Sequence, residues 1–124
     1  MTLLIVFAGA AVGAPLRYLT DLLVQSRHDS VFPWGTLTVN AAGSLVLGVT
    51  AGVLSADPGP AWVLALVGTG LCGALTTFST FAFETVRLTE EGSVLEAGLN
   101  MLATITVTLV ACAGGWSLAA ALAG

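Results

Sequence analysis

Charged residues are scarce in this chain of 124 residues, where Asp, Glu, Lys and Arg together make up only 8%. Lysine is absent, and three arginines face seven acids, so the formal net charge is −4. Proteins that hold nucleic acid neutralise its phosphates with Lys and Arg, which this chain does not supply. Nucleic acid is therefore excluded as a partner, and the hydrophobic content of 56% is too high for a typical soluble domain.

Cysteine and histidine are scarce as well, with two cysteines and one histidine in the whole chain. Cys72 and Cys112 each lie inside a long apolar run, where a thiol acts as a small hydrophobic group. The sequence contains no zinc-ligand spacing, disulfide framework or Gly-rich phosphate loop. His28 lies alone in a polar loop. We therefore expect that the protein is not an enzyme.

Most of the chain consists of long runs without charged residues. A bilayer core of about 30 Å requires roughly 20 apolar residues per helix. The spacing of the charges predicts four such helices, over residues 2–25, 33–56, 60–87 and 94–122. The connections between them are short and rich in Pro, Gly and polar residues. The predicted fold class is all-α: one four-helix integral membrane domain over residues 1–124, surrounded by the lipid of a cell membrane.

All three arginines, Arg17, Arg27 and Arg87, fall at or near the loops after the first and third spans. These two loops lie on the same side of the membrane, and the positive-inside rule places them in the cytoplasm with both termini outside. Three charges favour this orientation only weakly, so insertion in both orientations remains an alternative.

A single bundle of four such helices has no wide lumen, because side chains fill its centre. A transport role would therefore require an oligomer. Gly9 with Gly13, and Gly48 with Gly52, have the small-xxx-small spacing that lets helix backbones approach closely. Such pairs also arise by chance in a Gly- and Ala-rich membrane sequence.

Two polar stripes cross the apolar second and fourth spans, each with a spacing of four residues that places its members on one helix face. They are Thr36, Asn40 and Ser44 in the second span and Asn100, Thr104 and Thr108 in the fourth. An Asn in hydrocarbon needs partners, so the stripes either form hydrogen bonds between helices or supply donors to a solute that sheds its water. The presence of two matching stripes favours a pore.

The third span contains a weak helix-forming segment over residues 73–81, where five of nine residues are Gly, Thr or Ser. Hydroxyl side chains compete for backbone hydrogen bonds, and the segment predicts a helix break near the bilayer midplane. Carbonyls freed at that depth commonly bind a cation. The alternative is a kinked helix whose hydroxyls bond back to its carbonyls.

Phe78 and Phe81 flank this predicted break. The edge of an aromatic ring is positive, so a ring presented edge-on can contact an anion without holding it strongly. Together with amide and hydroxyl donors, the rings indicate an anion path rather than a cation path.

Three motifs resemble the Fluc/CrcB family of bacterial fluoride channels: residues 13–18 (Gly-Ala-Pro-Leu-Arg-Tyr), residues 33–44, and residues 70–81 followed by Glu84. The resemblance covers all four spans in order. It implies a fluoride-selective channel of the bacterial plasma membrane that passively exports cytoplasmic fluoride. It also implies an antiparallel, dual-topology dimer with two narrow pores. A homodimer is favoured, with a heterodimer of two related chains as the alternative.

The resemblance also implies roles for particular residues. A sodium ion at the dimer centre would be held by the backbone carbonyls of Gly73 and Thr76. The pore phenylalanines match Phe78 and Phe81, and the second-helix asparagine matches Asn40. The remaining predicted pore residues are Thr36, Ser44, Asn100, Thr104 and Thr108.

Arg17 matches the family's arginine near the end of the first helix, where it could attract anions at a vestibule. Its alternatives are snorkelling to the interface, or pairing with Asp21 one turn later.

A proton-coupled exporter of the small multidrug type is the competing hypothesis from another class, since it can also be a four-helix dual-topology dimer. Such a pump requires a carboxylate inside the membrane. Glu84, at the edge of the third span and beside Arg87, is the only candidate.

Overall fold

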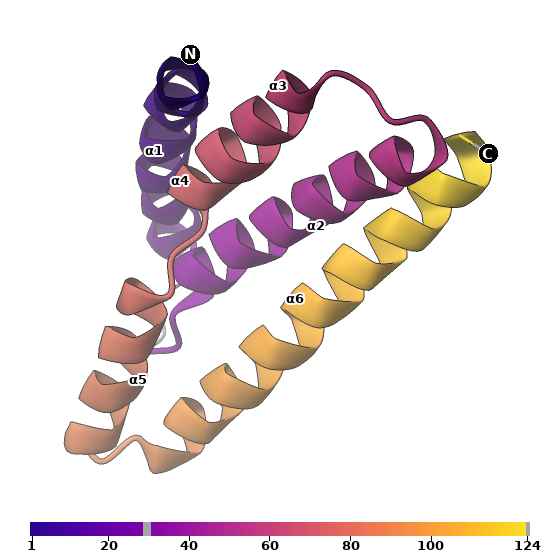
Figure 1. Ribbon diagram of the computed structural model, residues 1–124. Helices are drawn as coiled ribbons and strands as arrows, with labels where there is room; N and C mark the ends of the chain where they lie inside the picture. The colour runs from indigo at the N-terminus through magenta and orange to yellow at the C-terminus, as the bar shows by residue number, and fades with distance from the viewer. Residues whose placement is uncertain (29–30, 124) are drawn as a thin grey trace.

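A computed structural model describes residues 1–28 and 31–123 of the chain, and all of its regular structure is helical (Figure 1). Three of the four long segments are continuous helices: α1 (Thr2–Ser26), α2 (Trp34–Ala56) and α6 (Val94–Ala123). The remaining segment consists of α3 (Ala61–Val63), η1 (Leu64–Cys72), α4 (Gly73–Leu75) and α5 (Ser79–Glu90). No strand occurs among the described residues, which confirms the predicted all-α class.

Each of the four segments is long and apolar enough to span a membrane. The shortest has 23 residues, which at the rise of an α-helix corresponds to roughly 35 Å. The third span, Ala61–Glu90, and α6 have 30 residues each. The four predicted crossings are therefore confirmed as helices.

The third span is broken in its middle, at Thr76–Phe78, which we call the break. Thr76 has extended backbone angles (φ −83°, ψ 161°), and α5 starts at Ser79 after this interruption. The predicted break is confirmed. A second irregularity, which was not predicted, lies in η1, whose nine residues are wound as a π-helix, a rare form that is often found at functional sites.

Glycines allow two pairs of helices to touch along their backbones. A Cβ atom on Gly13 would overlap the carbonyl oxygen of Leu71 in η1, and one on Gly48 would overlap the carbonyl oxygen of Cys112 in α6. Gly9 and Gly52 make similarly close approaches. The two spaced glycine pairs are therefore packing contacts, of α1 with η1 and of α2 with α6.

Helix α2 lies side by side with α6 over most of its length, and α5 lies beside the first turns of α6 (Figure 1). A tight turn joins α5 to α6, in which Gly92 has a positive φ of 86° and Ser93 N–H donates to the carbonyl of Leu88.

The core of a single chain is thin. Leu88 and Val39 are only 1% exposed, but just 6% of the most apolar window of α6 is buried. Most of the apolar surface is therefore left for lipid or for another protein chain.

Candidate functional site

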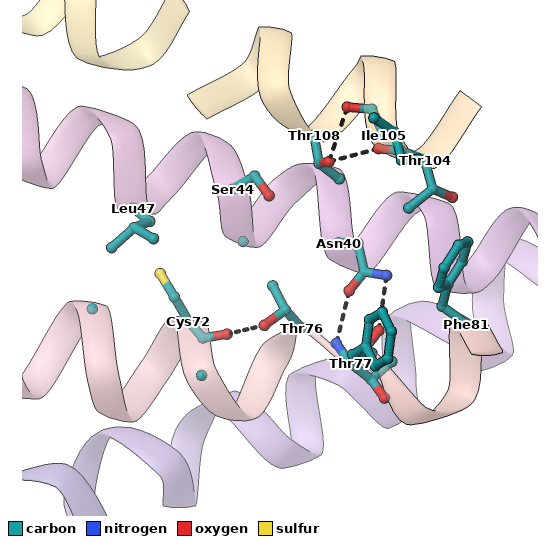
Figure 2. A pocket seen from close by; sticks show the side chains of 14 residues that line it. Asn40, Ser44, Leu47, Cys72, Thr76, Thr77, Phe81, Thr104, Ile105 and Thr108 are labelled. Atoms are coloured by element: carbon teal, nitrogen blue, oxygen red, sulfur yellow. Dashed lines mark hydrogen bonds between the residues drawn. The ribbon is translucent and has the colours of Figure 1, made fainter. Parts of the chain in front are cut away.

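A cavity of about 420 Å³ lies beside the break, between α2, the third span and α6 (Figure 2). We call it the break cavity. Its polar and aromatic lining comes from three separate parts of the chain. These residues are Asn40 and Ser44 from α2, Thr76, Thr77, Phe78 and Phe81 from the third span, and Thr104 and Thr108 from α6. None of the lining residues carries a charge.

Eight of the residues predicted for the pore and the sodium site line this one cavity. Gly73 belongs to the lining as well as Thr76. The other two, Thr36 and Asn100, lie outside it, as does Arg17, which was predicted for a vestibule.

Thr36 and Arg17 instead line a second cavity of about 190 Å³ between α1, α2 and the break, which we call the arginine cavity. The Thr36 hydroxyl donates a hydrogen bond to Glu84, with 2.5 Å between Oγ1 and Oε1. Thr77 lines both cavities. The polar stripe of α2 is therefore divided, with Thr36 on one side of the break and Asn40 and Ser44 on the other.

Arg17 is partly buried in the arginine cavity and shares its lining with Asp21. Across residues 1–28 and 31–123, no ion pair joins these two side chains. Arg87 pairs with Glu91 at 3.5 Å rather than with Glu84. Arg17 is therefore the cation whose charge is left to act on the arginine cavity.

Asn40 is buried and pairs with the backbone of the break. Its amide nitrogen donates to the carbonyl oxygen of Thr77 at 3.0 Å, and its Oδ1 accepts from Thr77 N–H at 2.7 Å (Figure 2). An Asn amide has two N–H donors. One therefore holds the break, and the second has no acceptor among the described residues, at a position that lines the cavity.

The hydroxyls of α6 donate to groups of their own helix. Thr108 donates to the carbonyl of Thr104 at 2.6 Å, and Thr104 donates to Asn100 Oδ1 at 3.4 Å. The Ser44 hydroxyl makes no hydrogen bond among the described residues. In this conformation the donors that are free to bind a solute in the cavity therefore come from α2. The hydroxyls of Thr104 and Thr108 must rotate away from their present acceptors before they can bind a solute.

Asn100 is fully buried behind the cavity, between α6 and α5. Its amide donates to Thr85 Oγ1 at 2.9 Å, and Thr85 donates to the carbonyl of Phe81 at 2.8 Å. Asn100 thus supports two lining residues, Thr104 and Phe81, without reaching the cavity itself.

The rings of Phe78 and Phe81 lie with their centroids 5.8 Å apart and their planes tilted by 50°. Phe78 ends the break and Phe81 lies in the first turn of α5. The two rings therefore lie at the C-terminal end of the break, one in its last residue and one just after it, and not on either side of it. Phe78 is 78% exposed in the single chain, so one side of the cavity wall faces out of the protein.

Two further residues shape the site and were not singled out from the sequence. A Cβ atom on Gly43 would overlap Cγ2 of Thr76, so Gly43 makes room for the break against α2. Thr77, two residues before the start of α5, accepts a hydrogen bond from Thr80 N–H at 3.2 Å and so satisfies one of the free N–H groups of the first turn. A hydroxyl residue ahead of a helix start was the signal that could have identified Thr77.

The fold and the site define a class: a small four-helix membrane protein whose third helix is broken beside an uncharged cavity of amide, hydroxyl and aromatic groups. Residues 4–116 match the family described as CrcB-like protein, Camphor Resistance (CrcB). The chain belongs to this family and is a multi-pass protein of the cell membrane.

Similar proteins carry the name of a channel. The chain is 55% identical over 129 residues to the fluoride-specific ion channel FluC 1 of Frankia casuarinae, covering 100% of both chains. It is 55% identical over 117 residues to the protein of the same name in Streptomyces avermitilis, covering 94% of each. For that of Thermobifida fusca the identity is 46% over 123 residues, covering 95% of this chain and 99% of the other.

Proposed function

We propose that this protein is a fluoride-selective channel through which cytoplasmic fluoride leaves the cell down its electrochemical gradient. The observation that carries the proposal is the break cavity, whose lining combines hydrogen-bond donors and two phenylalanine rings and contains no charged residue. Full-length identity of 55% to a protein named as a fluoride channel supports the same function.

The chemistry of the cavity suits a small, strongly hydrated anion. A pore for such an ion must replace its water with donors, and conduction requires that each site binds weakly enough to release the ion. Asn40 and Ser44 offer donors from α2 without a full charge. The edges of Phe78 and Phe81 add weak positive contacts.

An antiparallel homodimer of dual topology is the assembly that we propose. The break cavity has an exposed ring, Phe78, in its wall, and little of α6 is buried within one chain. A second chain would cover both. A heterodimer with a related chain is the alternative, and C-terminal reporter fusions distinguish them: signal from both sides of the membrane supports dual topology, and signal from one side supports a fixed partner.

A structural sodium ion at the backbone carbonyls of Gly73 and Thr76 is also part of the proposal. Both residues line the break cavity, and no hydrogen bond to either carbonyl oxygen occurs among the described residues. Carbonyl oxygens are ligands that suit a hard cation. When bound, the ion would supply positive charge beside an anion path.

A proton-coupled exporter remains the competing function, and Glu84 is the carboxylate that it would use. Glu84 accepts the bond from Thr36 and does not line the break cavity. An efflux experiment with fluoride-loaded proteoliposomes distinguishes the channel from the exporter. A channel releases fluoride down its gradient without moving protons, whereas a proton-coupled exporter must move protons in exchange and so changes the internal pH.

A further inference from the structure

We infer that the side chains of Asn40 and Thr77 create the cation site, because they divert the two backbone N–H groups that would otherwise occupy the carbonyls of Gly73 and Thr76. The inference rests on the proposed function, of which the cation is a part. It assigns Asn40 a role in positioning the backbone, in addition to its place in the lining of the cavity.

The first diverted group is Thr77 N–H. In an uninterrupted α-helix each N–H donates to the carbonyl four residues earlier, so this one would bond to Gly73. It donates instead to Asn40 Oδ1 at 2.7 Å. The side-chain amide nitrogen of Asn40 donates in turn to the Thr77 carbonyl at 3.0 Å. Asn40 therefore bonds to both backbone polar groups of Thr77 and fixes the direction of its backbone.

The second diverted group is Thr80 N–H, whose helical acceptor would be the carbonyl of Thr76. It donates instead to Oγ1 of Thr77 at 3.2 Å. The Thr77 hydroxyl thus satisfies an N–H of the first turn of α5 and, by the same bond, leaves the Thr76 carbonyl without its helical donor.

The free carbonyls are confined to the break and the turn before it. Gly73 and Thr76 are three residues apart, which is close to one helical turn, and neither carbonyl has a hydrogen-bond donor among the described residues. The neighbouring carbonyl of Cys72, in contrast, accepts two bonds, from the N–H of Thr76 at 2.9 Å and from its hydroxyl at 2.8 Å. On the other side, the carbonyl of Thr77 accepts from Asn40. The break therefore leaves free a short run of carbonyls that begins at Gly73 and ends at Thr76, and satisfies the carbonyls on either side of it.

Free carbonyls at membrane depth are costly unless they meet protein, water or an ion. Gly73 lines the break cavity, and the space beside its α-carbon is open, since an added Cβ would meet only the Gly68 carbonyl oxygen, at 4.0 Å. Two side chains that together keep both carbonyls free are thus an outer shell of the cation site, of the kind that orients metal ligands.

Sodium-dependent thermal stability tests the inference without relying on ion flux. The purified protein in detergent is heated at a series of sodium concentrations, with N-methylglucamine keeping the ionic strength constant, and unfolding is followed by tryptophan fluorescence. A ligand that binds only the folded state raises the unfolding temperature with its concentration. The quantity compared is the sodium concentration that gives half of the maximal rise.

Thr77→Val removes the hydroxyl and returns Thr80 N–H to the Thr76 carbonyl. Loss of an outer-shell partner typically weakens metal binding about 10- to 100-fold, so we expect the half-maximal sodium concentration to rise by that factor. Asn40→Leu is expected to do the same by releasing Thr77 N–H to Gly73. If one variant does not purify as a folded protein, the other decides.

Two controls separate diversion from a general loss of stability. Thr77→Ser keeps the capping hydroxyl and should keep the half-maximal concentration of the unmodified protein. Thr89→Val makes the same chemical change on α5, where the hydroxyl's one bond within the described residues is to the Thr85 carbonyl of its own helix, and it should not alter the sodium response.

The outcomes distinguish this inference from the proposed function. A sodium response that is the same in the unmodified protein, Thr77→Val and Asn40→Leu would overturn the inference and leave the proposed cation in place. If the unmodified protein itself does not respond to sodium, the proposed cation is refuted and the inference falls with it.

Discussion

The side-chain amide nitrogen of Asn100 lies 2.9 Å from the hydroxyl oxygen of Thr85 and joins α6 to α5. The chain of bonds continues from Thr85 to the backbone carbonyl of Phe81 and, on the other side, from Thr104 to Asn100. A residue that does not reach the cavity therefore connects the aromatic and the hydroxyl parts of its wall.

Asn100→Leu should lower the free energy of unfolding, because Thr104 loses its acceptor and a buried amide is removed. A lost buried partner costs about 1 to 3 kcal/mol, and the expected result is a lower unfolding temperature in detergent. Thr106→Val is the control, since Thr106 is exposed on the same helix. Equal unfolding temperatures for both variants would mean that the Asn100 bonds contribute nothing measurable.

Gly48→Ala should destabilise the protein, because its Cβ would overlap the Cys112 carbonyl and push α2 away from α6. Overpacking of this kind costs about 1 to 3 kcal/mol. Gly98→Ala on α6 has no heavy atom within 4 Å of the added Cβ and should stabilise the helix by about 0.5 to 1 kcal/mol. Thermal unfolding measures both, and shifts in the same direction would argue against the close packing of α2 on α6.

Phe78→Ile and Phe81→Ile should each reduce fluoride flux. An oriented aromatic contact is worth about 0.5 to 1.5 kcal/mol beyond its buried area, and losing that amount from the barrier lowers a rate about two- to tenfold. Phe83→Ile is the matched control, since Phe83 lies on α5 but does not line the break cavity. Unchanged flux in the first two variants, with the dimer intact, would mean that the rings only pack.

Arg17→Gln should lower fluoride flux at low salt. A unit charge about 4 Å from an ion is worth about 1 kcal/mol in water, which is about fivefold in rate, and salt screens it. Arg87→Gln is the control because Arg87 already pairs with Glu91. The measurement is flux at a low and a high concentration of an inert salt. A loss that does not shrink with salt would contradict an electrostatic role for Arg17.

The four spans could be predicted because the distance between charges can be read directly along the sequence. The break could be predicted for the same reason, from the run of Gly, Thr and Ser that weakens the third helix. Periodicity also placed Thr36 and Asn40 on one face of α2. It could not show that the break divides this face, since Thr36 meets Glu84, which is 48 residues away, and Asn40 meets Thr77, which is 37 residues away.

Partners across the fold also explain the other differences. Asn100 repeated the spacing of Asn40 and was predicted to line the pore, but it lies against Thr85 of α5, and the position of α5 depends on the break. The π-helical winding of η1 has no sequence pattern of its own. It accompanies the backbone contact of η1 with Gly9 and Gly13 in α1, which only the packed fold reveals.

Fluoride efflux from proteoliposomes, recorded with a fluoride-selective electrode beside a parallel recording of chloride, is the most direct test of the proposed channel. The pH is kept equal on both sides, and a potassium ionophore dissipates the membrane potential. The expected result is rapid fluoride release with chloride retained. Absence of fluoride efflux, or equal release of chloride, would contradict a fluoride-selective pore.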